Sequence, residues 1–147
     1  MKACPCTSGR AYAECCAPFH RGEREAETPA ALMRSRFAAF AIGDAEYLWR
    51  TVHPDHEDRM HPKEDVLRSL KEAARTLKYM RLTILDAQGP EVLFFAAVFE
   101  RGTDRSFVEL SSFAHDGTGW RYLAGETREA RGLAGLEALT VATFPRA

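Results

Sequence analysis

The sequence CPCTSGRAYAECC, residues 4–16, contains all four cysteines of the 147-residue chain. They form two tight pairs, Cys4-Pro5-Cys6 and Cys15-Cys16, with eight residues between the pairs. Soft thiolates grouped in this way are typical ligands of a single metal ion, and a closed set of four sulfurs favours one zinc ion per chain, with iron as the alternative. Because so short a segment buries little surface, we expect metal binding to supply its folding free energy.

Two other interpretations of the cysteines stay open. Two disulfides are possible, but disulfides rarely persist in the cytosolic compartment that the composition suggests. The adjacent Cys15 and Cys16 could serve redox chemistry, although the thioredoxin-type signature is Cys-x-x-Cys. Zinc-binding pairs usually have two to four intervening residues, whereas these pairs have one and none. Spacing alone therefore does not decide for the metal site.

The pattern Cys-Pro-Cys-x-Ser-Gly-x-x-Tyr-x-x-Cys-Cys resembles the SEC-C motif, a small zinc-binding module. The resemblance implies that the four metal ligands are Cys4, Cys6, Cys15 and Cys16. The last ligand of the motif is usually His, and this chain has Cys16 at that position. His20 is then a neighbour of the metal and not a ligand.

The composition is that of a globular protein, with 46% hydrophobic residues, 28% charged residues and a formal net charge of −1. The near-neutral charge argues against strong attraction to nucleic acid or anionic membranes. The longest apolar run, residues 92–99, is far shorter than the roughly 20 residues of a membrane-spanning helix, and we find no apolar signal segment. We therefore expect a cytoplasmic protein.

Three helices are predicted after a polar linker at residues 21–28. The first begins at Thr28-Pro29, a capping hydroxyl followed by proline, and ends at Gly43-Asp44. A second helix covers residues 45–52, and a third begins at Pro62 with an apolar stripe that reaches residue 77. The loop between these two helices holds His53, His56 and His61 among three acids. A solvated loop is the simpler interpretation, with a metal site as the alternative, and His53 could point toward the core.

The first helix places Arg36 inside its own apolar stripe, between Leu32 and Phe40, with Arg34 at the edge. A buried guanidinium keeps its charge and needs a carboxylate or carbonyl partner. Arg36 is therefore either part of a structural ion pair or a ligand-binding group at the mouth of a pocket.

The second half of the chain changes to a period of two. Alternation predicts strands at residues 79–86, 106–114 and 120–124, and the continuous apolar run at 92–99 predicts a central strand buried on both faces. Helices followed by an antiparallel meander give an α+β fold with helices on one sheet face. Glu109 shares a strand face with two phenylalanines, so we expect it to meet Arg36 or to share a pocket with it.

Four further segments resemble the YchJ family: TPAALMRSRF (28–37), GDAEYL (43–48), TVHP (51–54) and WRY (120–122). The resemblance spans about residues 3–125 and implies a SEC-C motif followed by a domain similar to nuclear transport factor two, in which a cone of helices is wrapped on a curved sheet. The family has no assigned biochemical role. YchJ-like chains commonly carry His-Glu-x-Ser-Arg-Phe where this chain has VELSSF (108–113), so an acid–base role of that His cannot operate here.

The expected organisation has three parts. A separable zinc knuckle covers residues 1–24 and should be dispensable for folding of the rest. A cone-like α+β domain of three helices on a curved antiparallel sheet covers residues 25–126. An extension with a loosely docked helix covers residues 127–147.

Three functions fit these features. The favoured one is a zinc-binding adaptor or binding protein, monomeric or dimeric, whose knuckle contacts a protein or ribosomal partner and whose cone holds a small ligand. It has no assigned catalytic residue, and its pocket candidates are Arg34, Arg36, Tyr47, His53 and Glu109. The second is a cone-pocket enzyme, of hydrolase, dehydratase or isomerase type, that uses an acid–base pair drawn from His53, Glu109 and Tyr47. The third, redox sensing through Cys15 and Cys16, requires a metal-free or labile site.

Overall fold

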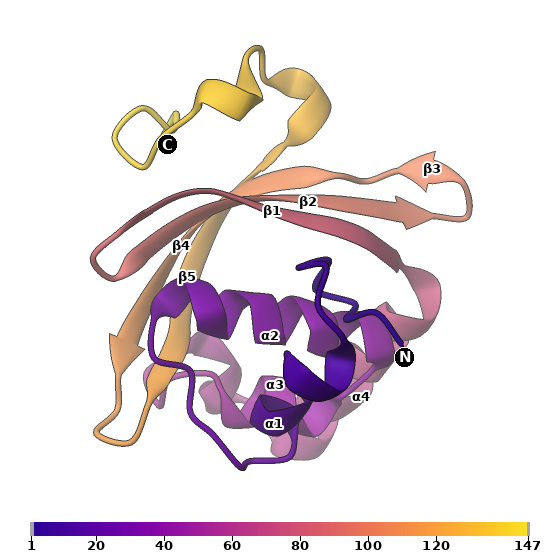
Figure 1. Cartoon of the computed structure of the whole chain (residues 1–147), viewed down its shortest axis with the longest axis vertical. Coiled ribbons are helices and arrows are strands. Elements are labelled where there is room, and N and C mark those ends of the chain that lie inside the picture. The colour runs from indigo at the N-terminus through magenta and orange to yellow at the C-terminus, as the bar shows by residue number, and fades with distance from the viewer. Residues whose placement is uncertain (1, 147) are drawn as a thin grey trace.

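A computed structural model describes residues 2–146 as helices packed against one face of a curved antiparallel sheet (Figure 1). The strands are β1 (Lys78–Gln88), β2 (Glu91–Glu100), β3 (Thr103–Asp104), β4 (Phe107–His115) and β5 (Trp120–Glu129). Their order in the sheet is β1-β2-β4-β5, and the short β3 pairs with β2. The α+β fold expected from the sequence is confirmed.

The helices are α1 (Ala17–His20), α2 (Pro29–Ile42), α3 (Ala45–Arg50) and α4 (Lys63–Thr76). The termini of α2 follow the local signals in the sequence. Thr28 accepts a hydrogen bond on its side chain from Ala31 N–H (3.1 Å), and Gly43 adopts the left-handed conformation with φ of 80°, which costs glycine little. These two residues fix the length of the helix that lies against the centre of the sheet.

The main core lies between α2 and the concave face of the sheet. Leu32, Met33 and Phe37 project from α2 onto the side of β2 that carries Phe94 and Val98. Leu32 and Val98 are each only 1% exposed. Apolar burial on this scale is the largest favourable contribution to folding, so this layer holds the cone together.

The opposite sheet face is covered by the C-terminal segment, which crosses above the sheet (Figure 1). Leu93, Val108 and Leu110 pack there against Val141 and Phe144. The prediction that β2 is buried on both faces agrees with this arrangement, and the tail is the second cover.

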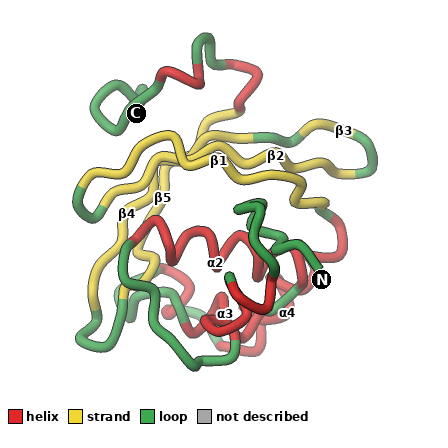
Figure 2. Tube along the Cα trace, in the orientation of Figure 1, coloured by secondary structure: helices red, strands yellow, loops and turns green. Residues whose placement is uncertain are grey.

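The prediction of a helix in the tail is wrong for the residues that the structure describes. The segment forms two 3₁₀ turns, Ala130–Gly132 and Leu136–Ala138, joined by loop (Figure 2). Gly135 takes a left-handed φ of 63°, which interrupts a right-handed helix. The preceding strand β5 also runs five residues beyond the expected end at Ala124, because its pairing with β4 continues to Glu129 opposite Phe107.

Two segments far from the sheet in sequence close its edges. The Thr7 hydroxyl donates to Leu82 O (3.3 Å) on β1 and accepts from Leu82 N–H (3.1 Å). At the other edge, β5 exchanges hydrogen bonds with the residues that follow α3: Tyr122 N–H donates to Thr51 O, and His53 N–H donates to Tyr122 O, both at 2.8 Å. None of the described helices is long and apolar enough to span a membrane.

Candidate metal centre and cone cavity

The four cysteine sulfurs lie within 4.8 Å of one another. Cys6 Sγ is 3.6 Å from Cys15 Sγ, and Cys15 Sγ is 3.9 Å from Cys16 Sγ. A tetrahedral zinc site with Zn–S bonds of about 2.3 Å has sulfurs about 3.8 Å apart, whereas a disulfide joins sulfurs at about 2.05 Å. All four cysteines are free thiols. The donor set therefore fits one ion held by four sulfurs.

The loop geometry of the knuckle brings the two pairs together. Ala3 and Ala11 form an antiparallel bridge, and Cys4 N–H donates to Arg10 O (2.9 Å). Between these positions the chain turns back through left-handed conformations at Thr7 (φ 63°) and Gly9 (φ 90°). A 3₁₀ turn at Tyr12–Glu14 and the start of α1 then carry the second pair.

Crowding makes the thiols chemically unequal. A hydrogen bond from Cys16 lowers the pKa of Cys6 to about 4, while burial raises the pKa of Cys4 to about 11. The same hydrogen bond to Cys6 raises the pKa of Cys16. One thiolate is thus stabilised by its protonated neighbours, but four thiolates would repel one another without a cation. Metal binding at this site should therefore release protons.

His20 lies beside the knuckle with both ring nitrogens engaged by other groups. Nε2 is 2.8 Å from Ser35 O, and Nδ1 is 2.7 Å from Tyr12 Oη. Because a carbonyl only accepts, Nε2 carries a proton, and in the neutral imidazole Nδ1 then accepts from the Tyr12 hydroxyl. Of the residues described, only the four cysteines form a group of three or more potential metal ligands, so the structure places no such group in the loop of His53, His56 and His61.

The His20 contact continues into the cone. Ser35 donates its hydroxyl to Leu32 O (2.7 Å), so the hydrogen bond between Ser35 and Tyr47 (2.6 Å) is donated by Tyr47. The rings of His20 and Tyr47 are 4.7 Å apart. Tyr47, 3% exposed, thus lies at the junction of knuckle and cone. The sequence carried one signal for this junction: Ser35 is a polar residue within the buried part of α2.

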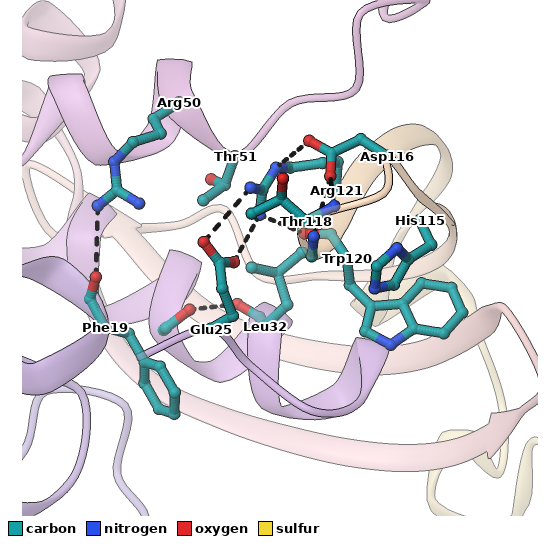
Figure 3. Close-up of polar contacts among 12 residues, drawn as sticks. Phe19, Glu25, Leu32, Arg50, Thr51, His115, Asp116, Thr118, Trp120 and Arg121 are labelled. Carbon is teal, nitrogen blue, oxygen red and sulfur yellow. Dashed lines mark hydrogen bonds and ion pairs between the residues drawn. The ribbon is translucent and has the colours of Figure 1, made fainter. Parts of the chain in front are cut away.

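The linker after the knuckle is also fastened to the sheet (Figure 3). Arg121 of β5, 6% exposed, donates to Glu25 Oε1 and to Asp116 Oδ2, each at 2.9 Å. A Cβ at Gly119 would lie 2.2 Å from Glu25 Oε1, so a larger residue there would displace the Glu25 carboxylate from its place beside Arg121. Ala26 is buried in the main core. Glu25 and Ala26 lie just outside residues 1–24, so these contacts fasten the linker to the cone, and the separability of residues 1–24 stays a prediction.

A cavity of about 420 Å³ lies between α2 and the concave sheet face. Most of its wall is aromatic or aliphatic, supplied by Met33, Phe37, Phe40, Tyr79, Phe94 and Phe107. Its polar lining includes Arg36, Glu109 and Tyr122. Glu100 and Arg105 also line it, and they form an ion pair with each other at 3.3 Å.

Arg36 and Glu109 share this cavity, with Tyr122 between them. Tyr122 donates its hydroxyl to Glu109 Oε2 (2.7 Å), and the Arg36 guanidinium lies 4.8 Å from the centre of the Tyr122 ring. Within the described chain no ion pair joins the two charged groups. We expect Arg36 and Glu109 either to meet or to share a pocket, and the structure shows that they share a pocket. Burial, followed by the charge of Glu109, raises the pKa of Tyr122, so Tyr122 remains a hydrogen-bond donor at neutral pH.

The other three sequence candidates lie outside the lining of this cavity. Arg34 points toward the knuckle, where Nη1 is 3.5 Å from Cys6 O. Tyr47 belongs to the junction described above. His53 accepts a hydrogen bond from Asp55 N–H on Nδ1 (3.1 Å). Sequence reasoning missed Tyr122, whose aromatic ring and hydroxyl on the last strand were the available signal.

Comparisons with known proteins agree with this architecture. The family model described as "YchJ, middle NTF2-like domain" matches residues 28–125, and the SEC-C motif matches residues 2–18. The fold and the cysteine cluster thus define the class of proteins that join a SEC-C motif to an NTF2-like domain. A UPF0225 protein of Deinococcus radiodurans is 46% identical over 126 residues, which cover 84% of this chain and 88% of that protein. This chain belongs to the YchJ family, whose members include uncharacterised UPF0225 proteins.

Further relatives and two solved structures extend the comparison. A UPF0225 protein of Bordetella parapertussis is 35% identical over 133 residues, covering 86% of this chain and 93% of that protein. The solution structure of a SEC-C motif containing protein from Rhodopseudomonas palustris has a TM-score of 0.71 at 31% identity, covering 84% of this chain and 96% of that one. A SEC-C motif containing protein from Psychrobacter arcticus, at 23% identity and TM-score 0.66, covers 84% of this chain and 81% of that one and shares the fold.

Proposed function

We propose that this chain is a zinc-stabilised binding protein whose cone holds a small, mostly apolar ligand. The observation that carries the proposal is the cavity of about 420 Å³ lined mainly by aromatic and aliphatic side chains. Small-molecule sites commonly have volumes of about 300–1,000 Å³, apolar walls and a few convergent polar groups. The cavity has each of these properties.

The zinc site has a structural role in this proposal. A closed set of four sulfurs is typical of structural zinc, which leaves no position for a substrate. The knuckle contacts the cone at two points: the Thr7 hydroxyl bonds to Leu82 of β1, and the His20 ring bonds to Ser35 O of α2. Zinc would fix the geometry of the knuckle and, through these contacts, the edge of the cone.

The knuckle also presents an exposed loop that suits a partner. Thr7, Gly9 and Arg10 are exposed, while the side of the knuckle that carries Cys6 packs on Ala38 of α2. This loop is the surface that we propose for contact with a protein or ribosomal partner. Co-sedimentation with ribosomes should then depend on zinc and should weaken in Arg10→Glu. Absent co-sedimentation would exclude the ribosomal partner, and zinc-independent co-sedimentation would exclude this loop as the contact surface.

An enzyme of the cone-pocket type is the second candidate, because the Tyr122–Glu109 hydrogen bond lies in the cavity as a potential acid–base pair. Binding is favoured over catalysis for two reasons. No histidine lines this cavity, and the carboxylate of Glu109 already accepts from Tyr122, Ser111 and Thr127. A base so fully hydrogen-bonded is poorly placed to take a proton from a substrate.

The test is binding of a neutral aromatic probe, 2-naphthol, to the zinc-loaded chain, followed by NMR. We expect shift changes confined to cavity residues such as Phe94 and Phe107. Val98→Phe, which fills the cavity from β2, should abolish them, while Ala142→Ser in the exposed tail should not. If neither 2-naphthol nor charged naphthalene derivatives bind, the proposed function is wrong.

A further inference from the structure

Arg36, which lines the cavity, carries a strong hydrogen-bond donor that the described residues do not satisfy. Arg36 is 5% exposed, and its two hydrogen bonds both start from Nη1, to Leu48 O (3.0 Å) and Thr51 Oγ1 (2.7 Å). Nε is buried without a partner in the part of the chain that the structure describes. Leaving buried donors of a charged group unpaired is costly. The unpaired Nε and Nη2 form one edge of the planar guanidinium, and such an edge matches the two oxygens of a carboxylate.

Glu109, the acid that faces the same cavity, already has its hydrogen-bond partners within the protein. Glu109 accepts two hydrogen bonds on Oε2, from Tyr122 and Ser111 (2.7 Å each), and a longer one on Oε1 from Thr127 (3.3 Å). Gly125 permits this cluster, since a Cβ there would lie 2.2 Å from Glu109 Oε2. A cationic ligand would find few free acceptor sites on Glu109 and would be repelled by Arg36.

The remaining charges of the lining are Glu100 and Arg105, which form an ion pair with each other. Among the described residues, Arg36 is thus the one cation of the cavity lining without an acidic partner, and the rest of the lining is mostly aromatic. A phosphate dianion would be poorly compensated by a single guanidinium close to Glu109, whereas a carboxylate carries one charge and fits one guanidinium edge.

We propose that the ligand of the cone is an apolar carboxylic acid whose carboxylate pairs with Arg36. This inference rests on the proposed ligand-binding function of the cavity and adds the chemical class of the ligand. An apolar cavity of about 150 Å³ is enough for benzene, so a cavity of about 420 Å³ accepts a two-ring aromatic acid or an aliphatic acid of similar volume. Phe37, Phe94 and Phe107 would contact the apolar body.

The experiment compares three probes of nearly equal shape by calorimetry on the zinc-loaded, full-length chain: 2-naphthoate, 2-naphthamide and 2-naphthylmethylammonium. Because hydrogen bonds that involve ionised groups are stronger than neutral ones, we expect naphthoate to bind about tenfold or more tightly than the amide, a difference of about 1.4 kcal/mol. The ammonium probe should bind most weakly.

The variant Arg36→Lys keeps the positive charge and removes the planar edge, so the preference for naphthoate over naphthamide should fall to about threefold or less. Arg50→Lys is the matched control. Arg50 also lies over a tyrosine ring, Tyr47 at 4.8 Å, but it is outside the cavity, and the preference should be unchanged. Unaltered binding of 2-naphthol will show that each variant keeps the cavity.

The outcomes separate the two proposals. Equal affinity for the three probes, or tighter binding of the ammonium probe, overturns the carboxylate inference and leaves the binding function standing. No binding of any probe, neutral or charged, overturns both. If Arg36→Lys fails to fold, the comparison of the three probes on the unmodified chain still decides the ligand class.

Discussion

Tyr122 connects the two charged groups of the cavity without letting them touch. Its ring supports the Arg36 guanidinium, and its hydroxyl donates to Glu109. The sequence correctly indicates that Arg36 is buried and that it shares a pocket with Glu109, which is half-buried, but it does not show that a tyrosine separates them. That detail depends on the pairing of β4 with β5, where Glu109 lies opposite Thr127. A register of this kind is a tertiary property.

The Glu109 cluster has little room, which gives the first prediction. A Cβ at Gly125 would lie 2.2 Å from Glu109 Oε2 and 2.3 Å from Tyr122 Oη. Gly125→Ala should therefore lower the free energy of unfolding by about 1–3 kcal/mol. Gly132→Ala is the control, because a Cβ there meets nothing within 4 Å, and it should change stability by at most about 0.5 kcal/mol. Urea unfolding of both variants is the measurement, and equal effects would contradict the account.

The tyrosines predict a pH dependence. Burial is the largest cause that raises the pKa of Tyr12, Tyr47, Tyr79 and Tyr122, to about 12 for Tyr79. Since the fold favours the neutral phenols, their contribution to stability is complete below pH about 10 and declines above it, where the unfolded chain loses protons that the folded chain keeps.

Tyrosinate absorbance measures this directly. At pH about 10.5 most of the four tyrosines should remain protonated in the folded chain, whereas most should be ionised in urea. Ordinary titration near pH 10 in the folded chain would show that these side chains are not buried as described.

At the scale of elements, local signals decided how much could be predicted. The ends of α2 were fixed by Thr28-Pro29 and Gly43, whose chemistry acts within one helical turn. The apolar run of β2 correctly indicated burial on both faces, since every side chain had to find an apolar cover. The tail was mispredicted because its leucines follow a helix-like spacing, while Gly135 and the contacts of Val141 and Phe144 impose turns instead.

The candidate site also has one part that could be predicted from local sequence and one part that could not. The four cysteines were predictable because they are close in sequence and share one chemistry. The cavity was not, because its lining comes from α2 and strands far apart in the chain. Arg34 and Tyr47 have suitable side chains for a pocket, but α2 and α3 direct them to the knuckle and to its junction with the cone. His53 lies in the loop after α3, where its ring accepts from Asp55 N–H.

The cover of the outer sheet face gives a prediction for the tail. Phe144 is 3% exposed and packs with Leu93, Val108 and Leu110, and Val141 N–H is held by Asp86 Oδ2 at 2.8 Å. Phe144→Ala should lower the free energy of unfolding by about 3 kcal/mol, within the range for buried phenylalanines. Ala142→Ser, at an exposed position, is the control and should have almost no effect. A loss below about 1 kcal/mol for Phe144→Ala, measured by urea unfolding, would mean that the tail is only loosely attached.

At the scale of the whole molecule, the knuckle and the cone share one set of contacts. His20 reaches Ser35, Thr7 reaches Leu82, and Arg121 reaches Glu25 in the linker. These contacts link the order of the knuckle to the stability of the cone. The contacts of His20 and Thr7 would be lost on deletion of residues 1–24, so they act against the expectation that the rest of the chain folds alone, which stays a prediction.

Removal of the metal tests this coupling. Because metal binding to the folded chain stabilises it, a chelator should lower the thermal midpoint of the whole chain while a single transition remains. Trp120, which lies on β5, is a suitable reporter for the cone after Trp49→Phe. Restoring zinc should restore the midpoint, and Cys16→Ser should respond only weakly to the chelator. A cone midpoint that does not change on chelation would show that the knuckle is a separable appendage.

We propose that four cysteines, and no histidine, bind one zinc ion at the edge of the cone. X-ray absorption at the zinc edge, on native chain with its metal content determined, measures the ligand set directly. We expect one zinc per chain with four sulfur neighbours at about 2.3 Å, the same spectrum in His20→Ala, and loss of most metal in Cys16→Ser. A nitrogen neighbour at about 2.0–2.1 Å, or a chain purified with iron or without metal, would contradict it.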